Sequence, residues 1–124
     1  MAETILLVDD EDALRSLSSE ILETMGYAVK QAGHGQEALE MYEQTGGSID
    51  LVVLDLAMPV MGGRETFRKL IALNPKVRVV VTTGSADEEE ARELLSMGVK
   101  AVIPKPYAVE QFTGIIKSVL DGGA

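Results

Sequence analysis

The chain is 124 residues long, and its length, composition and charge exclude several classes of protein. A chain of this length with 46% hydrophobic residues can bury a core of its own, so we expect one compact domain over residues 1–124. It contains no cysteine, which excludes disulfide-rich folds, thiolate metal centres and cysteine nucleophiles. Its 20 acidic and 11 basic residues give a net charge of −9, so we expect no direct nucleic-acid binding.

The N-terminal segment does not have the pattern of a targeting signal. No basic segment precedes its apolar run, and Asp9 and Asp10 end that run after four residues. This is too short for a signal peptide or a membrane-spanning helix. We therefore expect a cytoplasmic protein with no membrane insertion.

Five short runs of aliphatic and β-branched residues alternate with segments of helical periodicity. The predicted strands are residues 4–8, 27–31, 51–54, 77–82 and 100–103. The first helical segment has the clearest apolar stripe, formed by Leu14, Leu17, Ile21, Leu22 and Met25. Weaker stripes mark the other four segments: Ala38, Leu39 and Tyr42; Phe67, Leu70 and Ile71; Ala91, Leu94 and Leu95; and Val109, Phe112, Ile116, Val119 and Leu120.

This alternation predicts the fold class. The first, third and fourth strands are nearly continuous apolar runs, as expected of strands covered on both faces. The chain is therefore predicted to form a doubly wound α/β fold of five βα units, with a five-stranded parallel sheet between two layers of helices. Pro104 cannot donate a ladder hydrogen bond, which places the fifth strand at an edge.

Charged and hydroxyl side chains follow the predicted strands. Asp9 and Asp10 end the first strand, Asp55 the third and Thr83 the fourth, and Lys105 follows the fifth. In an open parallel sheet the functional crevice lies beyond these carboxyl ends. Clustered carboxylates repel one another unless a cation joins them, and oxygen ligands without histidine suit Mg²⁺. The residues therefore predict Mg²⁺-dependent handling of a phosphoryl group, with one aspartate as nucleophile.

Four motifs, at the ends of strands 1, 3, 4 and 5, make the chain resemble the receiver domain of two-component response regulators over almost its whole length. They are Val8-Asp9-Asp10-Glu11; Leu54-Asp55-Leu56-Ala57-Met58-Pro59 with Gly62-Gly63; Thr83-Gly84; and Lys105-Pro106-Tyr107. The resemblance implies a flavodoxin-like strand order of 2-1-3-4-5. It also implies a regulatory domain that catalyses its own phosphorylation and dephosphorylation but is not an enzyme with turnover.

The resemblance assigns roles to individual residues. Asp55 would accept a phosphoryl group from a histidine kinase or a histidine phosphotransfer domain. Asp10, Asp55 and the carbonyl of Ala57 would bind Mg²⁺ or Mn²⁺, with Asp9 acting through water. Lys105, Thr83 and Gly84 would contact the phosphoryl group and switch the conformation. The Lys105-Pro106 peptide bond is expected to be cis.

Two departures from the family pattern concern signalling and phosphoryl lifetime. The family usually has an aromatic residue where this chain has Val102, so we expect the signal to pass mainly through the loop and helix that start near Ala86. Ala57 and Ser85 occupy the positions that tune dephosphorylation in the family. Neither is suited to positioning an attacking water, so we expect a long-lived phosphoryl group.

Two other functions compete with the receiver. A Mg²⁺-dependent phosphatase would also use an aspartate nucleophile, but such enzymes place a second aspartate where this chain has Ala57. The segment from Gly33 to Ala38 matches the dinucleotide fingerprint G-x-G-x-x-A. It follows the second strand rather than the first, which favours a glycine-rich turn with His34 exposed.

The resemblance leaves two contexts open: a free-standing regulator, or the receiver of a hybrid histidine kinase. Val102 and Lys105-Pro106-Tyr107 favour the hybrid kinase. An output partner or attached effector domain would use the face formed by the last two predicted helices and the strand between them. A homodimer is a further expectation.

Overall fold

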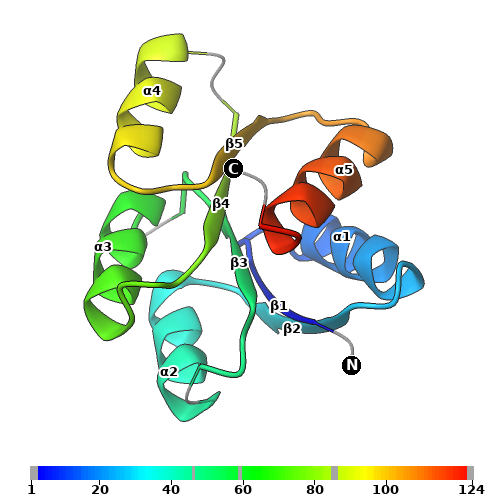
Figure 1. Ribbon diagram of the computed structural model, residues 1–124, viewed down its shortest axis with the longest axis horizontal. Helices are drawn as coiled ribbons and strands as arrows, with labels where there is room; N and C mark the ends of the chain where they lie inside the picture. The colour runs from blue at the N-terminus through cyan, green and yellow to red at the C-terminus, as the bar shows by residue number, and fades with distance from the viewer. Residues whose placement is uncertain (1–2, 46, 59, 85–86, 123–124) are drawn as a thin grey trace.

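The protein forms five βα units in succession, shown in Figure 1. The computed structural model describes residues 3–45, 47–58, 60–84 and 87–122. The elements are β1 (Thr4–Val8), α1 (Asp12–Thr24), β2 (Ala28–Ala32), α2 (Gly35–Thr45), β3 (Leu51–Asp55), α3 (Gly63–Leu73), β4 (Val79–Thr83), α4 (Glu88–Ser96), β5 (Ala101–Pro104) and α5 (Val109–Leu120). Among the described residues, no helix has the length and apolar character needed to span a membrane.

The five strands make one parallel sheet in the order β2-β1-β3-β4-β5. This confirms the predicted fold class and strand order. The fifth strand lies at an edge, where Pro104 pairs with Thr83 at the last register position.

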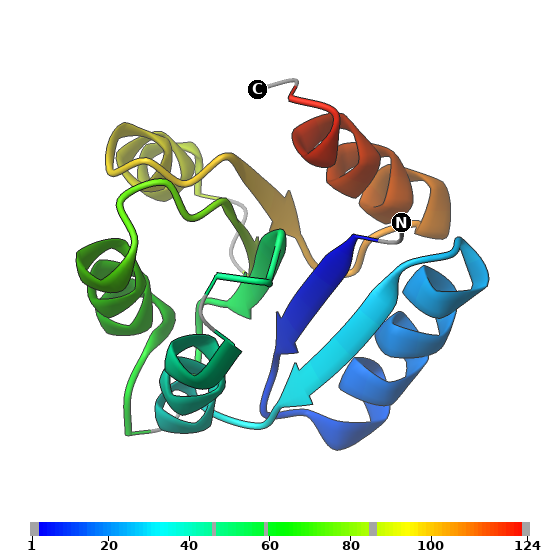
Figure 2. The same cartoon turned by 60° about the horizontal axis from the view of Figure 1, so that its bottom comes forward.

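Figures 1 and 2 show α1 and α5 covering one face of the sheet, and α2, α3 and α4 covering the other. Because side chains alternate along a strand, neighbouring residues of β1 and β3 enter different cores. Leu6 and Val52 pack under α2 to α4, whereas Leu7 and Val53 pack under α1 and α5. The central strand β3 is buried on both faces along its whole length.

The fourth strand begins at Val79 instead of residue 77, which corrects the predicted boundary. Val77 is buried, but its backbone N–H donates to the carbonyl of Asn74, so the residue completes a turn. The side chain of Asn74 also accepts from the N–H of Lys76, which fixes the turn further. Shifts of one residue occur at the start of β2 and of β5, where backbone pairing rather than hydrophobicity sets the limits.

The predicted apolar stripe of α1 is only partly correct. Leu17 is 54% exposed and Met25 is 43% exposed, while Ser18 and Ser19 are buried beside Leu22. The hydroxyl groups of Ser18 and Tyr107 lie 3.1 Å apart in a hydrogen bond. This partner lets a small polar side chain occupy the inner face of the helix.

Two other predicted stripes also have exposed members. Leu95 in α4 and Val109 in α5 are each about half exposed, at 48% and 50%. In α4 only Leu94 is buried, since this short helix lies over the β4–β5 edge of the sheet and not over its centre. Asp87 caps α4 by accepting from the N–H of Glu89 at 2.9 Å, which satisfies a backbone donor at the start of the helix.

Glycine lets α3 approach the carboxyl end of β3. A Cβ atom added to Gly63 would lie 2.7 Å from the carbonyl oxygen of Asp55 and from the Cα of Leu56. Both of these are backbone atoms, which cannot turn aside as the end of a flexible side chain could. Any larger residue would therefore push α3 away from the end of the strand that carries Asp55.

Candidate functional site

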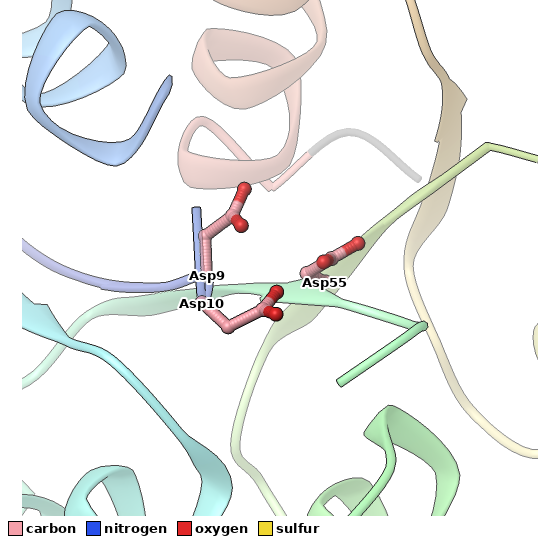
Figure 3. A group of neighbouring side chains, drawn as sticks. All are labelled: Asp9, Asp10 and Asp55. Atoms are coloured by element: carbon pink, nitrogen blue, oxygen red, sulfur yellow. The ribbon is translucent and has the colours of Figure 1, made fainter. Parts of the chain in front are cut away.

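Three carboxylates converge at the carboxyl ends of two neighbouring strands. Asp9 and Asp10 follow β1, and Asp55 is the last residue of β3 (Figure 3). Each of the three offers a carboxylate oxygen that lies within 4.8 Å of the others. Asp9 and Asp55 are buried, at 5% and 4% exposed, whereas Asp10 is exposed. We call these three residues the acidic cluster.

The protein itself engages both oxygens of the Asp9 carboxylate. Oδ1 accepts from the backbone N–H of Glu11 at 2.9 Å, and Oδ2 accepts from Lys105 Nζ at 3.3 Å. The first contact is the short-range bond by which an aspartate fixes a turn before a helix. Asp9 therefore stabilises the β1–α1 loop, which leaves Asp10 and Asp55 better placed to meet a ligand.

Lys105, which follows β5, pairs with two members of the acidic cluster. Its Nζ lies 3.3 Å from Asp55 Oδ1 as well as from Asp9 Oδ2, and 3.7 Å from Glu11 Oε1. The backbone N–H of Lys105 donates to the carbonyl of Thr83 at 2.7 Å. The peptide bond between Lys105 and Pro106 is cis, the isomer expected from the resemblance.

Burial and charge shift the pKa values of Asp55 and Lys105. Burial raises the pKa of the Asp55 carboxyl, Lys105 opposes this, and Asp9 and Asp10 add to it, so the net shift is upward. Burial alone would lower the pKa of the Lys105 ammonium, but the carboxylates of Asp55 and Asp9 outweigh it and the pKa is raised. Lys105 therefore remains a cation that balances part of the charge of the acidic cluster.

The other residues assigned by the resemblance differ in their exposure. Thr83 is buried at the end of β4, and Gly84 after it is exposed. Ala57 is exposed two residues beyond Asp55, and Val102 is partly buried against the core under α2 to α4. Ser85, together with Ala86 at the expected start of the signalling segment, lies outside the described residues.

Hydrogen bonds and close packing within the protein fix the Gly33–Gly35 turn. The N–H of Gly33 donates to Glu37 Oε1 at 2.7 Å, and the N–H of Glu37 donates to Nδ1 of the exposed His34 at 3.2 Å. A Cβ atom on Gly35 would collide with the Thr66 hydroxyl and press against Met61 Sδ. These contacts favour the predicted structural turn over a dinucleotide site.

Two arginines that make side-chain contacts between elements were not singled out in the sequence. Arg15 donates to the backbone carbonyl of Asp9 at 2.6 Å and pairs with Asp12 at 2.7 Å. The spacing of Asp12 and Arg15 is a sequence signal for that pair. Arg64, beside Gly63 in α3, forms ion pairs with Glu90 and Glu93 of α4. No local pattern signals the contacts of Arg64, because they join two helices.

Comparison with known proteins shows the family of the chain. The family model described as Response regulator receiver domain matches residues 5–117. The chain is 37% identical over 118 residues to the sensor kinase CckA of Brucella abortus, covering 95% of this chain and 12% of that protein. It is 32% identical over 120 residues to the chemotaxis protein CheY of Halobacterium salinarum, covering 97% and 98%.

A solved structure has the same fold. The crystal structure of the CheX-CheY-BeF3-Mg+2 complex from Borrelia burgdorferi matches with a TM-score of 0.90 and 26% identity, covering 94% of this chain and 88% of that chain. The chain thus spans nearly all of one chemotaxis protein but only a small part of the sensor kinase. It belongs to the response regulator receiver domain family, and it is a phosphoryl-accepting signalling domain of a two-component phosphorelay.

Proposed function

We propose that Asp55 accepts the phosphoryl group from the phosphohistidine of a histidine kinase or a histidine phosphotransfer domain. The observation that carries this assignment is the position of Asp55 at the end of the central strand. Its Oδ1 pairs with Lys105 Nζ, and the other two members of the acidic cluster lie beside it. Asp9 is a weaker candidate because the protein engages both of its oxygens. The match over residues 5–117 favours this function over the phosphatase and nucleotide-binding alternatives.

The transfer itself is a nucleophilic displacement at phosphorus. A carboxylate oxygen of Asp55 forms the new O–P bond while the N–P bond of the phosphohistidine breaks, and the imidazole leaves with the electron pair and takes up a proton. The ammonium of Lys105, already paired with Asp55, then pairs with an oxygen of the phosphoryl group. In this sense the domain catalyses its own phosphorylation.

The acidic cluster fits a divalent cation with a preference for oxygen ligands. Asp10, Asp55 and the carbonyl of Ala57 would hold Mg²⁺, with Asp9 contributing through water, and Mn²⁺ would occupy the same ligands. The bound ion would neutralise charge on the phosphoryl oxygens. The related CheX-CheY-BeF3-Mg+2 complex of Borrelia burgdorferi includes magnesium, which supports Mg²⁺ as the ion.

The switch would start at Thr83 and Gly84. A phosphoryl group on Asp55 carries nearly two negative charges where the carboxylate carried one, so about one further negative charge lies beside Lys105. It favours conformations in which the Thr83 hydroxyl contacts the phosphoryl oxygens. Val102 offers little surface to rotate, so the change would pass to α4. The expected output surface is formed by α4, β5 and α5, where Leu95 and Val109 are half exposed. It would bind an effector domain, a partner or a second copy.

Intact mass spectrometry tests the acceptor assignment. The protein is incubated with acetyl phosphate with and without Mg²⁺, beside Asp55→Asn, with Mn²⁺ as a further arm. We expect a gain of one phosphoryl group that requires both the cation and Asp55. The proposal fails if no group is gained with either ion, or if the gain persists in Asp55→Asn.

A further inference from the structure

Arg15 makes three contacts at the start of α1. Its Nη1 donates to the backbone carbonyl of Asp9 at 2.6 Å, its Nε donates to Gln31 Oε1 at 3.2 Å, and its Nη2 pairs with Asp12 Oδ1 at 2.7 Å. The Arg15 side chain is only 15% exposed. One guanidinium therefore connects the β1–α1 loop to α1 and to β2.

The acceptor of the 2.6 Å bond lies in the peptide group that leads from Asp9 into Asp10. On the other side of Asp9, its own N–H donates to the carbonyl of Ala32 at 3.1 Å. The loop is thus anchored to both β2 and α1 just before Asp10. Within the described residues no side chain pairs with the exposed Asp10 carboxylate, so its direction depends on this backbone.

We infer that Arg15 is a positioning residue for the cation site, acting through the Asp9 carbonyl to aim the carboxylate of Asp10. The inference rests on the proposed function, in which Asp10 is a metal ligand. Outer residues that orient a metal ligand commonly change affinity by about 10-fold to 100-fold when they are replaced. The planar fork of arginine suits this task because it reaches a carbonyl, an amide oxygen and a carboxylate at once.

Loss of the Arg15 charge and loss of its contacts would change the affinity for a divalent cation in opposite directions. The guanidinium is a cation near the acidic cluster, so removing its charge alone would strengthen the binding of a divalent cation. Losing the anchor would weaken binding, because Asp10 would have to be ordered when the ion binds. Arg15→Lys keeps the charge but cannot reproduce the three contacts of the fork.

Isothermal titration of Mg²⁺ into the unphosphorylated protein separates the two effects. We expect Arg15→Ala to bind Mg²⁺ about 10-fold more weakly than the wild type. Arg15→Lys should also bind Mg²⁺ more weakly than the wild type. Arg68→Ala, which removes an exposed arginine of α3, should bind like the wild type. Unchanged or tighter binding in Arg15→Ala, or wild-type binding in Arg15→Lys, overturns the inference. If Arg15→Ala does not fold, the lysine variant decides alone.

The rate of phosphorylation by acetyl phosphate against Mg²⁺ concentration gives a second readout. We expect Arg15→Lys to need more Mg²⁺ for half-maximal rate but to reach the wild-type maximum, a split that general damage to the fold would not produce. A lowered maximum with an unchanged Mg²⁺ midpoint overturns the inference. If the wild type binds no Mg²⁺, both the proposed function and the inference fail. If the wild type binds and the Arg15 variants bind equally, only the inference fails.

Discussion

Lys105 Nζ lies 3.3 Å from Asp55 Oδ1, although the strands β5 and β3 that position these residues are not neighbours in the sheet. The strand β4 runs between them, so the lysine side chain reaches over the carboxyl end of β4 to make the pair. Its backbone is tied there by the bond from the Lys105 N–H to the Thr83 carbonyl. Charge at Asp55 is therefore coupled directly to the ends of β4 and β5.

Asp55→Asn should stabilise the folded protein at neutral pH. Because the pKa of Asp55 is raised above 3.8 in the folded state, its contribution to stability is present below pH 3.8 and is lost as the pH rises through the folded pKa. Asparagine does not titrate, so the gain in the free energy of unfolding of Asp55→Asn over the wild type should grow from about pH 3 and level off above the folded pKa of Asp55. Urea unfolding measured from about pH 3 to neutral pH tests the prediction. The control is Glu23→Gln, at an exposed position of α1. A constant difference at all pH values would contradict it.

Lys105→Met should bind Mg²⁺ more tightly than the wild type, by about threefold or more. The ammonium pairs with Asp9 and Asp55 and competes with a divalent cation for the same carboxylates. Methionine keeps much of the length of the side chain and removes the charge. Titration calorimetry measures the change, with the exposed Lys100→Met as the matched control. Binding that is equal or weaker would show that Lys105 does not oppose the cation.

Arg64→Ala should loosen α4 with little cost to global stability. Arg64 pairs with Glu90 and Glu93 across the gap between α3 and α4, and its side chain is 30% exposed, so water screens both pairs. We expect a loss of about 0.5 kcal/mol in the free energy of unfolding. Backbone amides in α4 should exchange hydrogen faster, as hydrogen-exchange mass spectrometry would show.

The control for Arg64 is Lys69→Ala. That substitution breaks the pair of Lys69 with Glu65, which lies within α3 at a distance of 3.2 Å. It should leave exchange in α4 unchanged. Equal effects of the two substitutions would mean that the pairs between the helices do not hold α4.

Ala57→Asn should shorten the lifetime of the phosphoryl group on Asp55. Ala57 is exposed two residues beyond Asp55 and has no polar group with which to orient a water molecule. A side-chain amide at this position could hold the attacking water, and such positioning can change a rate by about 10-fold or more. The half-life is followed by intact mass after removal of the donor, with Ala57→Val as a control for size. An unchanged half-life in Ala57→Asn would count against the prediction.

The fold class and the members of the acidic cluster follow from the pattern of residues along the chain. Strands covered on both faces must be apolar almost throughout, and parallel strands end at the same edge, so Asp9, Asp10 and Asp55 could be brought together from their positions alone. Pro104 likewise placed β5 at an edge, because a residue without an N–H cannot join the middle of a ladder.

Which small and polar side chains are buried, and what they contact, depends on packing between elements that are distant in the chain. Ser18 is buried because its partner Tyr107, 89 positions away, satisfies its hydroxyl, and hydrophobic periodicity cannot detect such a pair. Position 63 requires glycine because two backbone atoms at the end of β3 leave no space for a Cβ atom. Arg64 forms an ion pair with Glu90 on another helix. Periodicity reports only whether a side chain avoids water, whereas contacts between distant elements depend on how those elements pack.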